Sequence, residues 1–196
     1  IATRVPHVRV STKLGPTSLD TAGRWIETDI TTPLGNPLTV VSCYVHSGEV
    51  DTPKLAAKYE FLTVMTKRMK QLGASDEAVV VVGDLNVGHR TLDIRNWKGN
   101  KKNSGFLPEE RAWLDRVFGE LGWVDAFREV DPRPDQYTWW SNRGQAWAKN
   151  VGWRIAYQIA TPGAARLAQR ESIYLRQRFS DHAPLTIDYD YDIVGR

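Results

Sequence analysis

The stretch AVVVVGDLN (residues 78–86) decides the fold. Residues 78–82 form a continuous apolar run rich in valine, which is typical of a strand buried on both faces of a sheet. Asp84 and Asn86 follow directly and lie two residues apart, so on an extended backbone their side chains would leave the same face. The stretch therefore predicts a central strand that presents an acid and an amide at the edge of the sheet.

The segments on either side of this strand show the periods of both strands and helices. WIETDI (residues 25–30), a turn at residues 33–37 and the apolar run at residues 38–45 predict a hairpin. Helical spacing predicts helices from Thr52 to Gly73 and from Pro108 onward, and further strands are expected at residues 138–141, 155–160 and 185–189. Because no linker or repeat divides the chain, we expect one domain over residues 1–196, of α/β class with a mixed sheet.

The composition is that of an ordinary globular protein, with 41% hydrophobic and 25% charged residues. A net charge of +3 favours a polyanionic partner only mildly. No apolar run is long enough to cross a bilayer and the first residues do not resemble a signal peptide, so we expect an intracellular, cytoplasmic protein with no membrane partner. The single cysteine, Cys43, lies in an apolar run and is expected to be a buried, inert thiol.

Two short segments carry residue types suited to phosphate chemistry: GDLN (residues 83–86) and SDHAP (residues 180–184). A carboxylate such as Asp84 can hold a hard cation or take a proton from water, and the Asn86 amide can donate a hydrogen bond to a phosphoryl oxygen. Asp181 can likewise bind metal, and His182 can deprotonate water near neutral pH. GDLN alone is also an ordinary turn after a strand, and this alternative remains open.

Tryptophans and lysines gather in the middle of the chain. Five of the eight tryptophans stand at positions 97, 139, 140, 147 and 153, where they suit either a core or a surface that stacks on sugars and bases. Residues 91–105 show no period and are expected to form a mobile loop. Its lysines, Lys98, Lys101 and Lys102, are candidates for contacts with phosphate groups, although a solvated loop explains them equally well.

Together these motifs resemble the exonuclease III and abasic-site endonucleases, within the endonuclease, exonuclease and phosphatase superfamily. The matching pieces are GRWI (residues 23–26), Tyr44 with SGE (47–49), KY (58–59) with FL (61–62), GDLN, FLPEER (106–111) with Trp113 and Asp115, YTWW (137–140), NVGWRI (150–155) and SDHAP. FLPEER favours the DNA-repair branch over lipid phosphatases and DNase I. The resemblance implies a four-layer, DNase I-like α/β sandwich, Mg²⁺ or Mn²⁺ as cofactor, and double-stranded DNA with abasic sites or blocked 3′ ends as substrate of a monomeric enzyme.

The resemblance also implies roles for individual residues. Asp84 and Asn86 correspond to the residues that activate the attacking water and bind the phosphate, and Tyr44 corresponds to a tyrosine that contacts the scissile phosphate. Asp181, together with Asp84, is expected to lie at the metal. His182 is expected to hydrogen-bond the phosphate or to stabilise its charge.

A pocket for a base-free sugar is a further implication. Trp139, Trp153 and Ile155 correspond to its apolar lining, and Asn150 to a substrate contact. Such a pocket selects damaged DNA because a missing base cannot clash and flipping the nucleotide out costs less. Without the resemblance, core packing would be a reasonable, somewhat less favoured alternative for the two tryptophans.

The chain departs from the family pattern in two places. Position 156 is Ala156, where the pattern has an aspartate that orients the catalytic histidine, so a large loss of rate is expected in what is either an engineered inactive variant or a degenerate paralogue. The FNxNG-like and Q-E motifs that supply an asparagine and a metal-binding glutamate are missing, and Ile1 is expected to start inside a strand. We therefore expect a domain that lacks its first strands and helix.

Three functions remain in competition. The leading hypothesis is a metal-dependent DNA-repair phosphodiesterase that cleaves at abasic sites or trims 3′ ends, impaired by Ala156 and by the missing segment. The second is a DNA-binding module that captures damaged duplex without cleaving it. The third, a phosphatase for a small phosphoester or lipid headgroup, is disfavoured by FLPEER and by the tryptophan cluster.

Overall fold

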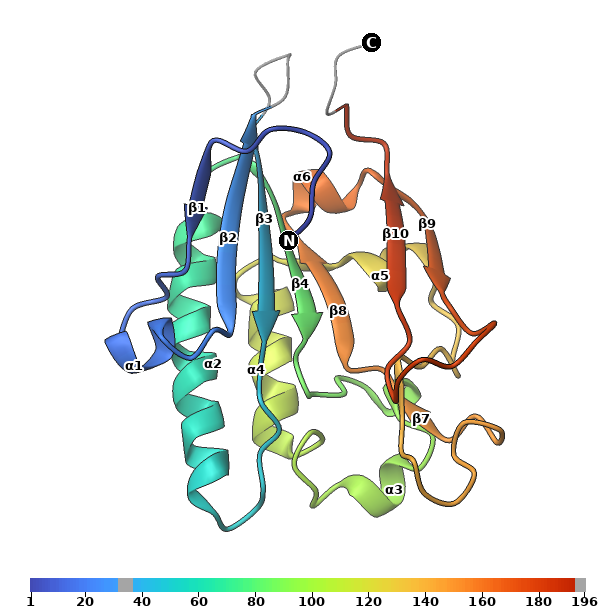
Figure 1. Ribbon diagram of the computed structural model, residues 1–196. Helices are drawn as coiled ribbons and strands as arrows, with labels where there is room; N and C mark the ends of the chain where they lie inside the picture. Colours follow the sequence, from blue (N-terminus) through green and yellow to red (C-terminus); the bar gives the residue numbers. More distant parts are fainter. Residues whose placement is uncertain (32–36, 193–196) are drawn as a thin grey trace.

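A computed structural model describes residues 1–31 and 37–192 (Figure 1). Its main element is a six-stranded sheet in the order β1-β2-β3-β4-β8-β5. The strands are β1 (Arg9–Ser11), β2 (Trp25–Thr31), β3 (Pro37–Tyr44), β4 (Ala78–Asp84), β5 (Val124–Asp125) and β8 (Ala156–Ala160). The β3–β4 pair is parallel and the other neighbouring pairs are antiparallel. The mixed sheet, the β2–β3 hairpin and the central position of β4 are thus confirmed, whereas all but Pro37 of the expected turn at residues 33–37 lies outside the described residues.

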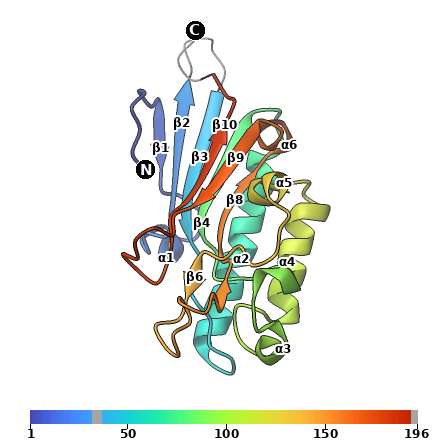
Figure 2. The same cartoon turned by 90° about the vertical axis from the view of Figure 1, so that its right-hand side faces the viewer.

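Two long helices cover one face of this sheet, as Figure 2 shows from the side. They are α2 (Pro53–Leu72) and α4 (Pro108–Gly119). Thr52 caps α2 by accepting a hydrogen bond from the Lys54 N–H, and both helices have proline in the first turn, where no amide donor is missed. Phe61 and Met65 of α2 pack with Leu114 of α4 against the valines of β4 in the main core. Both predicted helices are therefore confirmed.

A second, short sheet lies over the opposite face, near β4 and β8. Its antiparallel strands are β9 (Ala168–Ile173) and β10 (Leu185–Tyr189). Ile187 of β10 packs with Val80 of β4 and with residues of α5 (Ala126–Val130) and α6 (Pro162–Ala165) in a second core. The described residues therefore form two sheets, with α2 and α4 on the outer face of the larger one. These layers belong to the sandwich that was expected.

The remaining short helices and strands lie mainly in the segments that connect the strands at the lower end of the sheet. They are the 3-10 turn η1 (Thr91–Asp93), α3 (Trp97–Asn100), β6 (Trp139–Trp140) and β7 (Gly152–Trp153), with α1 (Thr17–Asp20) beside β2. Residues 91–105, expected to form a mobile loop, contain η1 and α3, and Asp93 among them is buried and pairs with Arg154 and Arg128. Short helical turns of this length carry no visible period.

Two further expectations concern the chain's beginning and its thiol. Ile1 does not lie in a strand; it is exposed, and the first strand is β1 at the sheet edge. Cys43 is buried in the main core, and burial raises the pKa of its thiol to about 12, as expected for an inert side chain. Within the described parts of the chain, no helix combines the length and apolar character needed to span a bilayer.

Candidate active site

The two predicted segments meet at one end of the large sheet, the lower end in Figure 1. Because β3 and β4 run parallel, their carboxyl ends coincide, and the antiparallel β8 begins at the same edge. Tyr44, Asp84 and Ala156 are consequently register partners across the three strands. SDHAP reaches this edge from the second sheet, because Trp139 forms an isolated bridge with His182.

Asp84 and Asn86 form a compact turn directly after β4. The Asn86 backbone N–H donates to Asp84 Oδ1, and the Asn86 side-chain nitrogen donates to Asp84 Oδ2, both at 2.8 Å. Asn86 has a left-handed backbone with φ of 50°, so the two side chains meet through a turn and not along an extended strand. The turn interpretation and the convergence of the two polar groups are therefore both correct.

The Asn86 amide is already engaged on its donor side. Its nitrogen also donates to the Val45 carbonyl at 2.8 Å, so both hydrogens have partners. A hydrogen bond from this amide to a phosphoryl oxygen therefore requires that one of the two present bonds breaks.

Asp84 has the electrostatics of a proton acceptor. Burial is the largest influence and raises the pKa of its carboxyl, with a smaller contribution from the charge of Asp181. The Asn86 N–H and the charges of His182 and Lys58 lower this pKa without cancelling the effect of burial. The His182 Nε2 atom lies 3.8 Å from Asp84 Oδ2, close enough for an ion pair when the imidazole is protonated.

Asp181 is held as an ionised carboxylate. Its Oδ2 atom accepts a hydrogen bond from Trp139 Nε1 and its Oδ1 atom accepts one from the Ser180 hydroxyl, each at 3.0 Å. The bond from Trp139 is the largest influence and lowers the pKa of Asp181. Asp181 therefore offers a hard, negatively charged oxygen at neutral pH.

These two carboxylates suit a hard divalent cation. Among the residues that the structure describes, no three His, Cys, Asp or Glu side chains gather closely enough to hold an ion by themselves. Mg²⁺ keeps several waters and takes only one or two carboxylates together with phosphate oxygens. The donor set of Asp181 and Asp84 fits such an ion.

A cavity of about 290 Å³ opens beside Asn86. Its walls comprise the predicted pocket residues Trp139, Trp153 and Ile155, together with Ser47, Asn86, Asn100, Asn103, Ser104 and Gly105. Trp139 and Trp153 are register partners of β6 and β7, and their rings meet edge to face at 6.2 Å. Core packing describes Trp140, which is buried, but not these two half-buried rings. Another cavity, of about 320 Å³ around Asp93 and Arg154, is lined by charges that pair with one another.

A buried ion pair, which no sequence pattern indicated, supports the turn and the cavity wall. Lys58 Nζ donates to the Asn86 carbonyl at 2.9 Å and to Glu110 Oε1 at 2.5 Å, with both side chains fully buried. Glu110 also accepts from the Gly105 N–H at 2.6 Å. FLPEER contains Glu110, so the motif signalled this residue, but only the fold shows that it holds Asn86 in place.

Among the other predicted site residues, Tyr44 and the three lysines are exposed. Tyr44 is 45% exposed at the end of β3. Lys98 and Lys101 lie over the Trp97 ring at 5.7 and 4.8 Å, and Lys102 is exposed beside them. Asn150 does not line the cavity.

Asn150 has a structural task where the chain turns between β6 and β7. Its side chain accepts a hydrogen bond from Trp140 Nε1 at 3.0 Å and donates to the Asp135 carbonyl at 3.2 Å. Substrate contact by Asn150 therefore stays a prediction that this geometry does not favour.

Ala156 stands at the centre of the site. Its N–H donates to Thr138 Oγ1 at 3.0 Å, and its half-buried methyl group lies across the strand pair from Asp84. Position 156 therefore lies next to Asp84, while its expected role in orienting His182 stays a prediction.

Known proteins are similar to this chain in sequence and in fold. Recombination repair protein 1 of Drosophila melanogaster is 30% identical over 191 residues, which cover 97% of this chain and 27% of that protein. An exodeoxyribonuclease of Bacillus subtilis is 40% identical over 110 residues, which cover 56% of this chain and 43% of the relative. The chain thus spans less than half the length of these relatives.

Among solved structures, an AP endonuclease from Archaeoglobus fulgidus superposes with a TM-score of 0.83 at 25% identity, covering 95% of this chain and 72% of that one. This agreement confirms the DNase I-like α/β class expected from the motifs. The model of the endonuclease/exonuclease/phosphatase family matches residues 5–182, a range that includes GDLN, Asp181 and His182. The chain therefore belongs to the endonuclease/exonuclease/phosphatase family, and its similarity to an exodeoxyribonuclease and an AP endonuclease bears out the resemblance to the DNA-repair branch.

Proposed function

We propose that this chain carries most of the active site of a metal-dependent DNA-repair phosphodiesterase that acts at abasic sites and on 3′ ends. The observation that carries the proposal is the position of Asn86, which hydrogen-bonds Asp84 and also lines the cavity of Trp139, Trp153 and Ile155. One residue thus joins a proton-accepting carboxylate to an apolar pocket of the size expected for a small ligand.

In this mechanism the phosphate of the cleaved bond lies between GDLN and SDHAP. Asp84 takes a proton from water as the water oxygen bonds to phosphorus and the bond to the leaving sugar oxygen breaks. His182 stabilises the charge that grows on the phosphoryl oxygens, and the exposed Tyr44 hydroxyl contacts the same group. A Mg²⁺ or Mn²⁺ ion held by Asp181 and Asp84 would supply charge neutralisation at the phosphate.

The cavity supports a preference for damaged DNA. Trp139, Trp153 and Ile155 offer apolar walls to a flipped sugar that carries no base, whereas an intact base adds bulk that the walls must accommodate. We propose double-stranded DNA with abasic sites or blocked 3′ ends as the partner, and a monomer acting inside the cell.

The alanine at position 156 is a reason to expect slow cleavage by this chain. The imidazole of His182 has Asp84 as its nearby acid, at 3.8 Å, and the methyl group of Ala156 offers no hydrogen bond. For this reason the second candidate, a module that binds damaged DNA without cleaving it, remains the alternative for the chain as it stands.

The deciding experiment compares a duplex that contains one abasic analogue with the same duplex intact, each incubated with Mg²⁺ and the 196-residue chain. We expect preferential binding of the abasic duplex and slow nicking that Asp84→Asn abolishes while leaving binding in place. Selective binding without any Asp84-dependent nicking would support the binding module. Equal binding of both duplexes, without nicking, would exclude both functions.

A further inference from the structure

Two exposed aromatic rings lie on the loop that joins β9 to β10. Tyr174 and Phe179 stack with their ring centroids 6.1 Å apart and their planes inclined by 19°. Phe179 is 73% exposed, and Leu175 between them is 52% exposed. Exposed apolar side chains that lie together commonly mark an interaction site, so this pair of rings is a candidate contact surface.

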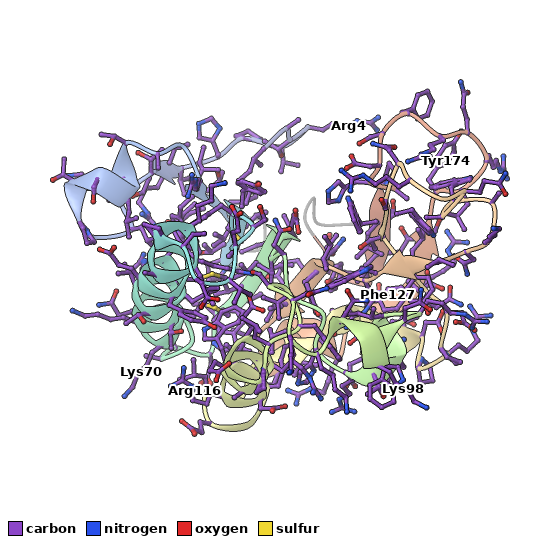
Figure 3. The ribbon with its side chains drawn as sticks, turned by 90° about the horizontal axis from the view of Figure 1, so that it is seen from below. Arg4, Lys70, Lys98, Arg116, Phe127 and Tyr174 are labelled. Carbon is purple, nitrogen blue, oxygen red and sulfur yellow. The ribbon has the colours of Figure 1, made fainter. Side chains whose placement is uncertain are left out.

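The loop is anchored, and it is the loop that carries SDHAP. The Tyr174 N–H donates to the Pro184 carbonyl at 3.0 Å, which extends the β9–β10 pairing by one step. Arg178 donates to the Ser180 carbonyl at 3.0 Å and to Asn142 Oδ1 at 2.5 Å. Figure 3 shows the lower end of the molecule from below, with Tyr174 at the outer rim and well separated from Lys98.

The charges on this loop complement a nucleic-acid strand. In the sequence YLRQRF (residues 174–179), Arg176 and Arg178 lie between the two aromatic residues. Within the described part of the chain, the exposed Arg176 guanidinium has no hydrogen bond or ion pair. Aromatic faces beside guanidinium groups are the combination that binds single-stranded nucleic acid, by stacking on bases and by contact with phosphates.

We propose that Phe179, backed by Tyr174, is a stacking platform for an unpaired base of the DNA next to the cleavage point, with Arg176 on the adjacent phosphate. A base inside a duplex has both faces covered by its neighbours, so the platform favours substrates with a single-stranded 3′ end. This inference rests on the proposed function because it takes DNA as the partner of the neighbouring site.

The experiment measures the affinity of the 196-residue chain, without divalent metal, for a blunt duplex and for the same duplex with a short unpaired 3′ overhang that contains 2-aminopurine. Phe179→Leu keeps an apolar side chain but removes the aromatic face, and we expect about tenfold weaker binding of the overhang duplex, with little change for the blunt one. Phe179→Trp should retain both the affinity and the quenching of 2-aminopurine fluorescence. Leu175→Ala, at another exposed apolar position on the same loop, serves as the matched control and should change neither.

An equal loss of affinity for both duplexes in Phe179→Leu would overturn the platform, as would no loss for either one. The measurement needs no cleavage, so an inactive chain does not affect it. If the platform fails while Asp84-dependent nicking persists, the proposed function survives.

Discussion

Asp84 and Ala156 face each other as register partners on the antiparallel strands β4 and β8. Side chains opposite one another in an antiparallel pair share a face, with their Cβ atoms about 5 Å apart. His182 Nε2 lies 3.8 Å from Asp84 Oδ2, so a carboxylate at position 156 would stand beside both groups. Ala156 itself places no charge beside these two groups.

Ala156→Asp is expected to raise the rate of nicking of an abasic duplex on the order of a hundredfold, because the added carboxylate can orient the imidazole and support its positive charge. Single-turnover nicking with Mg²⁺ measures this rate. Ala156→Asn is the matched control, since it fills the same space without the charge and should recover much less. Equal rates for the two variants would show that size at position 156, and not charge, limits the reaction.

The left-handed backbone of Asn86 allows its chemical and conformational roles to be separated. Asn86→Gly removes the amide but tolerates φ of 50°, whereas Asn86→Ala removes the amide and adds about 1 kcal/mol of backbone strain. We expect both variants to lose nicking to a similar extent, while urea unfolding shows Asn86→Ala to be the less stable of the two. If Asn86→Gly nicked at the original rate, the amide would have no direct part in the reaction.

The sequence predicted the elements whose signals are local. The valine run of β4, the proline starts of α2 and α4 and the paired segments GDLN and SDHAP each depend on neighbouring residues. The contacts of Lys58 with Glu110 and of Arg154 with Asp93 join residues 52 and 61 positions apart, so no local pattern could reveal them. The left-handed backbone of Asn86 was not predicted, because an extended backbone would also bring the side chains of Asp84 and Asn86 together.

The indole of Trp139 is expected to act through Asp181. Trp139→Phe keeps an apolar ring in the cavity wall but deletes the hydrogen bond from Nε1 to Asp181 Oδ2, and groups that orient metal ligands typically contribute tenfold or more to affinity. We therefore expect the Mg²⁺ concentration for half-maximal nicking to rise about tenfold. Trp153→Phe, the same change on the partner ring, should leave this concentration unaltered. Titrations of MgCl₂ against nicking rate distinguish the two, and an identical response would assign the effect to the shape of the pocket.

The buried charges around Asp93 predict the acid stability of the fold. Burial disfavours the Asp93 carboxylate, but the guanidinium groups of Arg154 and Arg128 outweigh it and lower the pKa to about 2. The pKa in the unfolded chain is about 3.9, so this group's contribution is complete above that value and disappears as the pH falls through about 4 toward about 2. Asp93→Asn should therefore cost about 3 kcal/mol of unfolding free energy at pH 7 and should flatten the loss of stability in this window.

Urea unfolding at neutral pH and at several values below pH 4 tests this expectation. Asp188→Asn is the control, because Asp188 pairs with Arg170 at the surface, where an ion pair contributes at most about 1 kcal/mol. If the two variants lost the same stability, or if Asp93→Asn kept the full pH dependence of the original chain, the Asp93 network would not be the origin of acid sensitivity. A larger loss of unfolding free energy in Asp93→Asn, confined to pH values above the folded-state pKa of Asp93, would show that this buried ion pair stabilises the fold. The pair of Asp93 and Arg154 would then be the contact that holds η1 against β7.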